Sequence, residues 1–183
     1  MNQVRLSTFD NHWYRPGPQW KVVLWFLVNP WTLNSYLPLP VAFKRSVLRV
    51  FGAKIGRGVV IKPKVNVKYP WFLEIGDHAW VGEEVWIDNL TFVRIGPNAC
   101  LSQGAMLLTG NHDYARSTFD LRVNGITLEA GVWVGARATV CPGVTCHTHA
   151  VLAVGSVATQ ALEAYGVYQG NPARLVRKRQ ISA

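Results

Sequence analysis

The chain has few charged side chains and few cysteines. Asp, Glu, Lys and Arg together make up 16% of its 183 residues, against about 25% in an average soluble domain. Hydrophobic residues make up 49%, so the chain has enough apolar surface to fold and is not expected to be disordered. Gly and Pro number 16 and 10, which excludes a collagen-like or linker-like chain. The length fits one domain with an appended arm.

Cysteine and long apolar runs are both scarce. The three cysteines form no Cys-x-x-Cys pair and stand at Cys100, Cys141 and Cys146. This pattern excludes a disulfide scaffold and a zinc ribbon, and it fits a reducing, cytoplasmic compartment. The longest apolar run covers residues 22–28, whereas a transmembrane helix needs about 20 residues. The polar first 19 residues do not have the pattern of a signal peptide.

The charge that is present is mainly positive. Lys and Arg number 19 against 10 Asp and Glu, which gives a net charge of +9. Nucleic acid, anionic lipid and phosphorylated small molecules are partners that such a charge attracts. No nucleic-acid-binding motif accompanies it, so nucleic acid is not the expected partner.

The strongest pattern is a six-residue repeat over residues 54–160. Nearly every hexad begins with an aliphatic residue, many continue with Gly, and the fifth position is Ala, Val or Ser. A period of six fits neither a helix nor a two-faced sheet, but it is typical of short strands separated by turns, whose stacked coils bury one continuous core. The repeat therefore predicts an all-β fold of stacked coils. Hexads begin at Ile55, Ile61, Ile75, Val81, Ile95, Leu101, Val134, Val140, Cys146 and Leu152.

The repeat is interrupted near residues 68–74, near 88–94 and over 108–127. The third interruption is the longest and contains Asn111 and His112. A polar loop that leaves a repetitive scaffold is a common place for a functional site.

Two segments flank the repeat. Residues 1–53 are expected to contain two helices, at 20–28 and 41–51, that cap the repeat, and an amphipathic segment that touches a membrane surface is also compatible with them. Residues 161–183 are expected to form a basic tail that packs along the domain before fraying.

Several motifs, together with the hexads, resemble the hexapeptide-repeat acyltransferases, most closely the sugar O-acetyltransferases of colanic-acid type. They are Thr109-Gly110-Asn111-His112, Val132-Trp133-Val134-Gly135, Pro142-Gly143-Val144-Thr145 and Gly170-Asn171-Pro172-Ala173-Arg174. The resemblance covers about residues 20–178. It implies a left-handed parallel β-helix, an exception to the usual right-handed crossover. It also implies acetyl transfer from acetyl-CoA to a glycan or a nucleotide- or lipid-linked sugar in bacterial polysaccharide biosynthesis, by a homotrimer with active sites between subunits.

The resemblance assigns the general base to His112. A sugar hydroxyl is a poor nucleophile, and histidine is the side chain that titrates nearest to neutral pH. The hydroxyl would then attack the bound thioester directly, and the backbone amide of Ala136 would stabilise the oxyanion. The residues implied to bind the acceptor are Asp88, Asn89, Asn111 and Trp133.

Coenzyme A is implied to lie in a groove of small residues that ends at basic ones. Arg and Lys suit its phosphates. The implied residues are Gly135, Val154, Gly155, Thr159, Arg174, Arg177 and Lys178. One position departs from the family pattern. Family members often have a Lys directly after the threonine at position 159, whereas this chain has Gln160 there.

Other interpretations remain open. The same motifs fit an acetyltransferase for an amino sugar, serine or an antibiotic, and the repeat alone fits a non-catalytic scaffold. A metal-dependent carbonic anhydrase of this fold would need a second histidine where the chain has Ser117, so no metal site is predicted. Asp88 and Asn89 are also compatible with an ordinary turn. Trp133 is also compatible with a residue that only covers the outer face, and the basic tail with a solvated segment.

Overall fold

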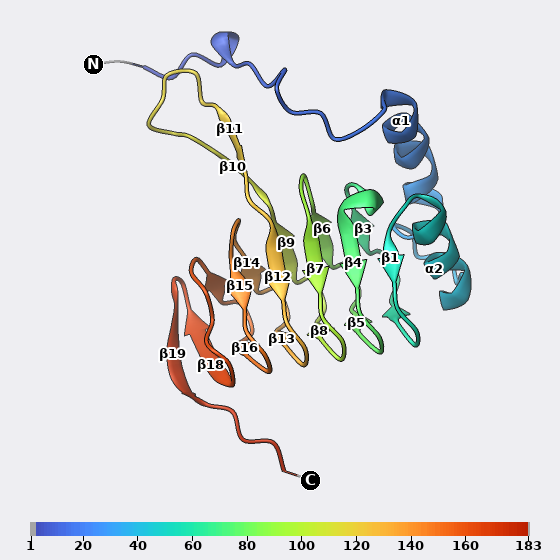
Figure 1. Ribbon diagram of the computed structural model, residues 1–183, viewed down its shortest axis with the longest axis vertical. Helices are drawn as coiled ribbons and strands as arrows, with labels where there is room; N and C mark the ends of the chain where they lie inside the picture. The colour runs from blue at the N-terminus through green and yellow to red at the C-terminus, as the bar shows by residue number, and fades with distance from the viewer. Residues whose placement is uncertain (1–2, 183) are drawn as a thin grey trace.

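A computed structural model describes residues 3–182, which form a solenoid of parallel β-strands with a helical cap at one end (Figure 1). Each coil contributes one short strand to each of three sheets. Sheet A consists of β1 (Lys54–Ile55), β4 (Leu73–Ile75), β7 (Val93–Ile95), β12 (Ile126–Leu128) and β15 (Thr145–Cys146). Sheet B consists of β2 (Val60–Ile61), β5 (Trp80–Val81), β8 (Cys100–Leu101), β13 (Trp133–Val134), β16 (Val151–Leu152), β18 (Gly166–Gly170) and β19 (Ala173–Lys178). Sheet C consists of β3 (Asn66–Val67), β6 (Trp86–Asp88), β9 (Met106–Leu108), β14 (Thr139–Val140) and β17 (Val157–Ala158).

The interior of the solenoid is filled by the first residue of each hexad. Ile61, Val81 and Leu101 are fully buried, and the small Ala79 and Ala105 fit beside them. Cys146 occupies one of the aliphatic positions, and its burial raises the pKa of the thiol to about 12. A thiol that stays protonated is neither a nucleophile nor a metal ligand, so this cysteine is a core residue, as the hexad pattern predicts.

The helical cap closes the first coil. Helices α1 (Gln19–Val28) and α2 (Val41–Val50) agree with the predicted ranges to within one residue, and short 3₁₀ turns are present at Leu6–Thr8, Asn29–Trp31 and Pro70–Phe72. Along the walls of the first coil the backbone N–H groups donate to the second coil, as Gly56 does to the carbonyl of Ile75 at 2.8 Å. The carbonyl groups of these wall segments therefore face the cap.

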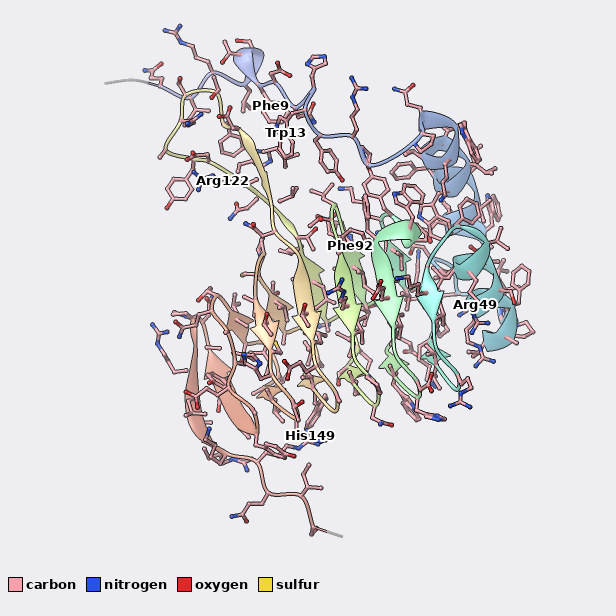
Figure 2. All side chains as sticks on the ribbon, in the orientation of Figure 1. Phe9, Trp13, Arg49, Phe92, Arg122 and His149 are labelled. Atoms are coloured by element: carbon pink, nitrogen blue, oxygen red, sulfur yellow. The ribbon has the colours of Figure 1, made fainter. Side chains whose placement is uncertain are left out.

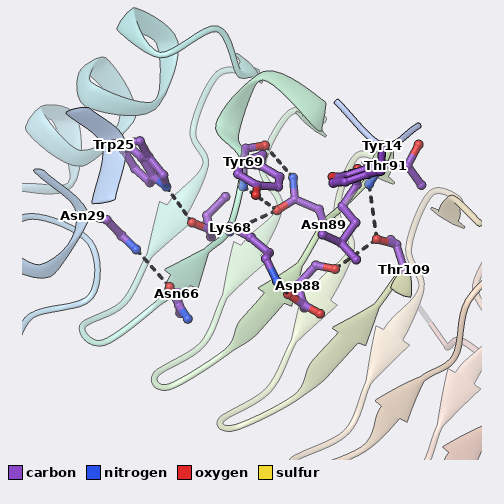
Figure 3. Close-up of polar contacts among 12 residues, drawn as sticks. Tyr14, Trp25, Asn29, Asn66, Lys68, Tyr69, Asp88, Asn89, Thr91 and Thr109 are labelled. Atoms are coloured by element: carbon purple, nitrogen blue, oxygen red, sulfur yellow. Dashed lines mark hydrogen bonds and ion pairs between the residues drawn. The ribbon is translucent and has the colours of Figure 1, made fainter. Parts of the chain in front are cut away.

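The cap supplies one side-chain donor to each wall of the first coil. Arg49 Nη2 donates to the carbonyl of Ile55 at 2.8 Å in sheet A. Lys44 Nζ lies 3.2 Å from the carbonyl of Lys62, at the end of the sheet B strand. Trp25 Nε1 donates to the carbonyl of Val67 at 2.8 Å in sheet C (Figure 3). An open strand edge is a site for unwanted pairing, and these three donors close it.

The last coil extends beyond the predicted boundary at residue 160. Leu162 is fully buried and bridges to Cys146. β18 then pairs with β16 in parallel, and β19 folds back antiparallel onto β18. The predicted tail over 161–183 is thus in large part a structured end of the solenoid. The hexad pattern ends early because this coil is shortened and its interior residue in sheet B is Tyr168.

A hairpin leaves the solenoid between β9 of sheet C and β12 of sheet A, within the predicted excursion over 108–127. It is formed by β10 (Gly110–His112) and β11 (Leu121–Val123). An ion pair between Arg122 and Asp113 at 2.5 Å braces it. Residues 5–17, which we call the N-terminal strap, run past this hairpin on their way to α1 (Figure 1), and the amide of Arg5 donates to the carbonyl of Ser117 at 2.8 Å. Over residues 3–182, no helix combines the length and the apolar content that crossing a membrane requires.

Candidate active site

A cavity of about 540 Å³ lies where the hairpin, the strap and the corner between sheets C and A meet. Figure 2 shows Phe9 and Trp13 of the strap near the hairpin that carries Arg122. The cavity brings together three of the predicted site residues, Asp88, Asn111 and His112. Its other lining residues are Phe9, Asn11, Tyr14, Pro16, Lys68, Tyr69, Leu90, Gly110 and Leu121.

His112 is held in one tautomer by the backbone of the hairpin. Its Nδ1 lies 2.9 Å from the carbonyl oxygen of Phe119. A carbonyl oxygen can only accept a hydrogen bond, so Nδ1 carries the proton of the neutral ring and the lone pair is on Nε2. The backbone amide of His112 donates to Oδ1 of Asn111 at 2.8 Å. His112 therefore offers one basic nitrogen, with the other nitrogen anchored.

Two aromatic rings fix the plane of the His112 imidazole. The ring of Phe119 stacks on it at a centroid distance of 4.3 Å and an angle of 8°, and the ring of Phe9 lies tilted at 5.7 Å. Phe119 has a φ of 53°, a left-handed conformation that is strained for a bulky residue. Phe119 adopts this strained conformation while both its ring and its carbonyl contact His112.

Asp88 supplies the carboxylate of the cavity. Its Oδ1 is 2.9 Å from Lys68 Nζ, and the two side chains are 18% and 33% exposed. The hydroxyl of Tyr14 donates to the carbonyl of Leu90 at 2.5 Å. Burial, reinforced by Tyr69 and Asp88, raises the pKa of Tyr14, so this phenol stays neutral and keeps its bond to Leu90, while its oxygen can accept. The cavity thus combines a carboxylate, an ammonium group and a neutral phenol, which are groups that can bind a polyhydroxylated molecule.

Asn89 lies outside the cavity although it was expected to bind the acceptor. It is fully buried, and Figure 3 shows its side chain bonded to the backbone of the preceding coil. Its Oδ1 accepts from the amides of Lys68 and Tyr69, each at 3.1 Å, and its Nδ2 donates to the carbonyl of Tyr69 at 2.6 Å. All of its polar atoms are used, so Asn89 fixes the corner that presents Lys68 and Asp88.

The residues expected to bind the thioester lie elsewhere on the solenoid. Trp133 is half exposed on sheet B, and its Nε1 donates to Oγ of Ser102 at 2.9 Å. Gly135 and Ala136 form the turn from sheet B to sheet C, where the carbonyl of Ala136 accepts from the amide of Gly155 at 2.9 Å. A Cβ on Gly135 would lie 2.7 Å from the amide nitrogen of Val154. Only glycine allows the two coils to approach this closely.

The residues expected to bind the far end of coenzyme A are exposed. Thr159 and Gln160 follow β17 at the corner between sheets C and A, two coils beyond the hairpin. Arg174, Arg177 and Lys178 lie on β19, and Lys178 Nζ pairs with Glu163 at 2.9 Å. In the part of the chain that the structure describes, none of the predicted coenzyme A ligands lines the His112 cavity. A single chain therefore presents two separate halves of the predicted site.

The other histidines do not gather into a metal site. His147 Nδ1 lies 3.0 Å from the carboxylate of Glu129 on sheet A, and the ring of His149 packs against Tyr165. Among residues 3–182, no three His, Cys, Asp or Glu side chains converge as metal ligands would.

Lys68, Tyr69 and the strap residues of the cavity were not predicted from the sequence. A signal for Lys68 exists in the spacing of the hexads. Ile55, Ile75 and Ile95 are 20 residues apart, so a residue 20 positions before Asp88 lies on the adjacent coil beside it. No such spacing points to Phe9, Asn11 or Tyr14, because the strap reaches the cavity from outside the repeat.

The chain is similar to known acetyltransferases. It is 38% identical over 167 residues to the protein assigned as the colanic acid biosynthesis acetyltransferase WcaF of Escherichia coli strain K12, with 91% of each chain covered. It is 26% identical over 151 residues to the galactoside O-acetyltransferase of the same strain, covering 79% of this chain and 73% of that one. No family model matches the chain.

Solved structures share the fold. A galactoside acetyltransferase in complex with coenzyme A superimposes with a TM-score of 0.79 at 23% identity, covering 88% of this chain and 82% of that one. A hexapeptide-repeat acetyltransferase from Vibrio cholerae superimposes with a TM-score of 0.76 at 22% identity, covering 89% and 90%. These likenesses confirm the expected left-handed β-helix of hexapeptide repeats.

Proposed function

The chain belongs to the hexapeptide-repeat acetyltransferases of the colanic-acid type, and we propose that it transfers an acetyl group from acetyl-CoA to a hydroxyl of a sugar in bacterial polysaccharide biosynthesis, with His112 as the general base. The tautomer of His112 is the observation that carries this proposal. Its Nδ1–H is held by the carbonyl of Phe119, so the lone pair on Nε2 is available to a hydroxyl in the cavity.

The reaction needs one proton acceptor that later becomes a proton donor. As the hydroxyl oxygen attacks the thioester carbon, its proton passes to Nε2 of His112. The imidazolium keeps its Nδ1–H···O=C bond to Phe119, which disperses part of the new charge. When the tetrahedral intermediate collapses, the C–S bond breaks and the proton on Nε2 passes to the sulfur of coenzyme A. No covalent enzyme intermediate is required.

The acceptor is proposed to bind in the His112 cavity. Asp88 can accept hydrogen bonds from sugar hydroxyls, while Lys68 and the side-chain amide of Asn111 can donate to them. The strap residues Asn11 and Tyr14 form the wall facing this corner. Asn89 contributes by holding the corner rather than by contacting the sugar.

The donor is proposed to bind along the edges of sheet C. Gly135, Val154, Gly155 and Thr159 would line the pantetheine arm, the amide of Ala136 would meet the thioester oxygen, and the phosphates would lie near Arg174, Arg177 and Lys178. Because one chain keeps these residues apart from His112, we infer that a neighbouring subunit completes each site in a homotrimer. Trp133 would then contact an acceptor that is bound in the cavity of another subunit.

The walls of the solenoid support this assembly. The outward residues of sheets B and C include half-exposed tryptophans at positions 80, 86 and 133. Sheet A instead presents a ladder of charges, in which Glu74 pairs with Lys54 at 2.6 Å and with Arg94 at 3.4 Å. Exposed aromatic surface is typical of interfaces, whereas charged ladders are typical of solvated faces.

The test is acetyl transfer by wild-type protein and His112→Ala, measured as coenzyme A release with a panel of free, nucleotide-linked and lipid-linked sugars. Amino sugars, serine and antibiotics complete the panel, because they represent the alternative acceptors. We expect a sugar to be acetylated and the variant to lose about 100-fold or more in kcat, while it still binds acetyl-CoA. Near-normal turnover by His112→Ala would refute the assignment of the base.

A further inference from the structure

Helix α1 is apolar on both of its faces. The inward face carries Trp25, which is fully buried. The outward face carries residues spaced three and four positions apart, with exposures between 44% and 67%: Trp20, Val23, Leu24 and Leu27. Trp31 follows directly after the helix and is 72% exposed. A surface helix normally presents polar side chains outward, so this second apolar stripe indicates a binding surface.

The segment that contains α1 has no acidic residue. Between Asp10 and Glu74 the sequence has ten Lys and Arg and neither Asp nor Glu. The rest of the chain has nine basic and ten acidic residues, so the net charge of +9 originates entirely in this segment. Three of its ten cationic residues form ion pairs with carboxylates of the next coil, namely Lys54, Arg57 and Lys68. Within residues 3–182 the other seven have no carboxylate partner.

We propose that the outward face of α1 docks on an anionic lipid bilayer. Trp20, Leu27 and Trp31 would enter the interfacial region, where tryptophan is favoured. The cations of this segment other than the buried Lys44, the exposed Arg15 among them, would attract the anionic headgroups. The helix has 10 residues, which is too short to span a bilayer but long enough to lie in its surface. Charge argues against a second copy as the occupant, since two such caps would repel one another, whereas anionic lipid attracts them.

A groove leads from this helix to the candidate active site. It encloses about 840 Å³ between the strap and α1, and Arg15, Gln19 and Val23 are among its lining residues. It shares Asn11, Tyr14 and Pro16 with the His112 cavity. Docking of α1 would therefore bring the cavity alongside the membrane and present it to a lipid-linked sugar. This consequence rests on the proposed function, whereas the docking itself does not.

Co-sedimentation of the full chain with vesicles tests the docking. We expect binding to vesicles of phosphatidylcholine mixed with phosphatidylglycerol, little binding to phosphatidylcholine alone, and weakening as salt is raised. The double variant Trp20→Ser, Leu27→Ser should bind at least about tenfold more weakly, because each large apolar side chain withdrawn from water contributes about a factor of ten or more. The matched control Val176→Ser, Ile181→Ser removes two exposed apolar side chains near the C-terminus and should bind as wild type.

Three results would overturn the docking proposal. They are failure of the wild type to bind the anionic vesicles, equal binding by the α1 double variant, and equal loss in the control variant. Light scattering without lipid addresses the rival occupant, since a lower oligomeric state of the α1 variant together with unchanged vesicle binding would assign the face to a second copy. Calorimetry with acetyl-CoA separates the two proposals. If the wild type binds acetyl-CoA but not the vesicles, the docking proposal is wrong and the proposed function still stands. If it binds the vesicles but not acetyl-CoA, the proposed function is wrong and the docking proposal still stands.

Discussion

The ring of His112, the proposed general base, is oriented by contacts with Phe119. The stacked ring and the carbonyl of Phe119 both contact the imidazole, and this residue keeps a left-handed conformation in order to do so. At the scale of single residues, the geometry of the proposed base therefore depends on a residue that would not touch the reacting atoms.

We predict that Phe119→Ala lowers kcat by about tenfold or more, since a small misplacement of a catalytic group is costly. The pH profile of kcat should change as well, because the stacked ring no longer limits how the imidazole moves and hydrates. Phe119→Tyr keeps the ring and should restore both. Steady-state kinetics over a pH series is the measurement, and an unchanged profile for Phe119→Ala would remove its positioning role.

The ion pair of Asp88 and Lys68 allows a second prediction at this scale. Asp88→Asn removes an acceptor that we assign to the sugar, and it leaves the ammonium of Lys68 without its partner. Hydrogen bonds to charged groups contribute about 1.5–3 kcal/mol, so KM for the acceptor should rise about tenfold or more. KM for acetyl-CoA should stay the same, because we assign Asp88 to the acceptor and not to the donor. A rise in both KM values would contradict this division of the site.

At the scale of elements, the cap supplies hydrogen-bond donors to the open edge of the first coil and also covers its hydrophobic interior. Lys44 is buried and donates to two backbone carbonyls, and burial lowers the pKa of its ammonium group. Each of the three walls is closed by a different side chain, so the contributions can be removed one at a time.

We predict that Trp25→Phe destabilises the fold by about 1–3 kcal/mol, because a buried carbonyl of Val67 loses its donor while most of the packing remains. Trp20→Phe on the exposed face of the same helix is the matched control and should change stability by less than about 0.5 kcal/mol. Denaturant unfolding measures both. Equal effects would show that the hydrogen bond contributes little.

At the scale of the whole molecule, the solenoid separates the proposed base from the proposed donor site. The hairpin leaves at the corner of sheets C and A, whereas the turn at Gly135 joins sheets B and C. Within one chain these two corners cannot come together unless the coils bend. When the solenoids of two chains pack side by side, a corner of one chain can lie against a different corner of the other.

We predict that Trp86→Arg, on the outer face of sheet C, prevents assembly of the proposed trimer and abolishes acetyl transfer. The half-exposed side chain should tolerate the charge in a folded monomer, so far-UV circular dichroism should be unchanged. Thr145→Arg places the same charge on the outer face of sheet A and should stay trimeric and active. Light scattering with activity assays measures this, and an active monomer would refute the site between subunits.

The hexads predicted the coils because each aliphatic residue at Ile55, Ile61 or Ile75 is the interior residue of one wall. The polar interruption with His112 predicted a loop that leaves the coils, since its residues cannot occupy interior positions, and the structure shows that this loop is a hairpin. Prediction failed at the last coil, where Leu162 and Tyr168 lie outside the hexad spacing. It also failed for Asn89, because sequence alone does not show whether an amide at a corner faces outward or bonds to the adjacent coil.

The sequence by itself therefore determined the solenoid, the position of the hairpin and the family. These properties follow from local periodicity, in which each hexad specifies its own wall, and from motifs that are contiguous in the chain. Only the tertiary structure decided which residues face His112, how its tautomer is held, and which side of α1 is exposed. Those properties depend on contacts between segments such as the strap, Phe119 and the corner at Lys68, whose separation in the chain carries no periodic signal.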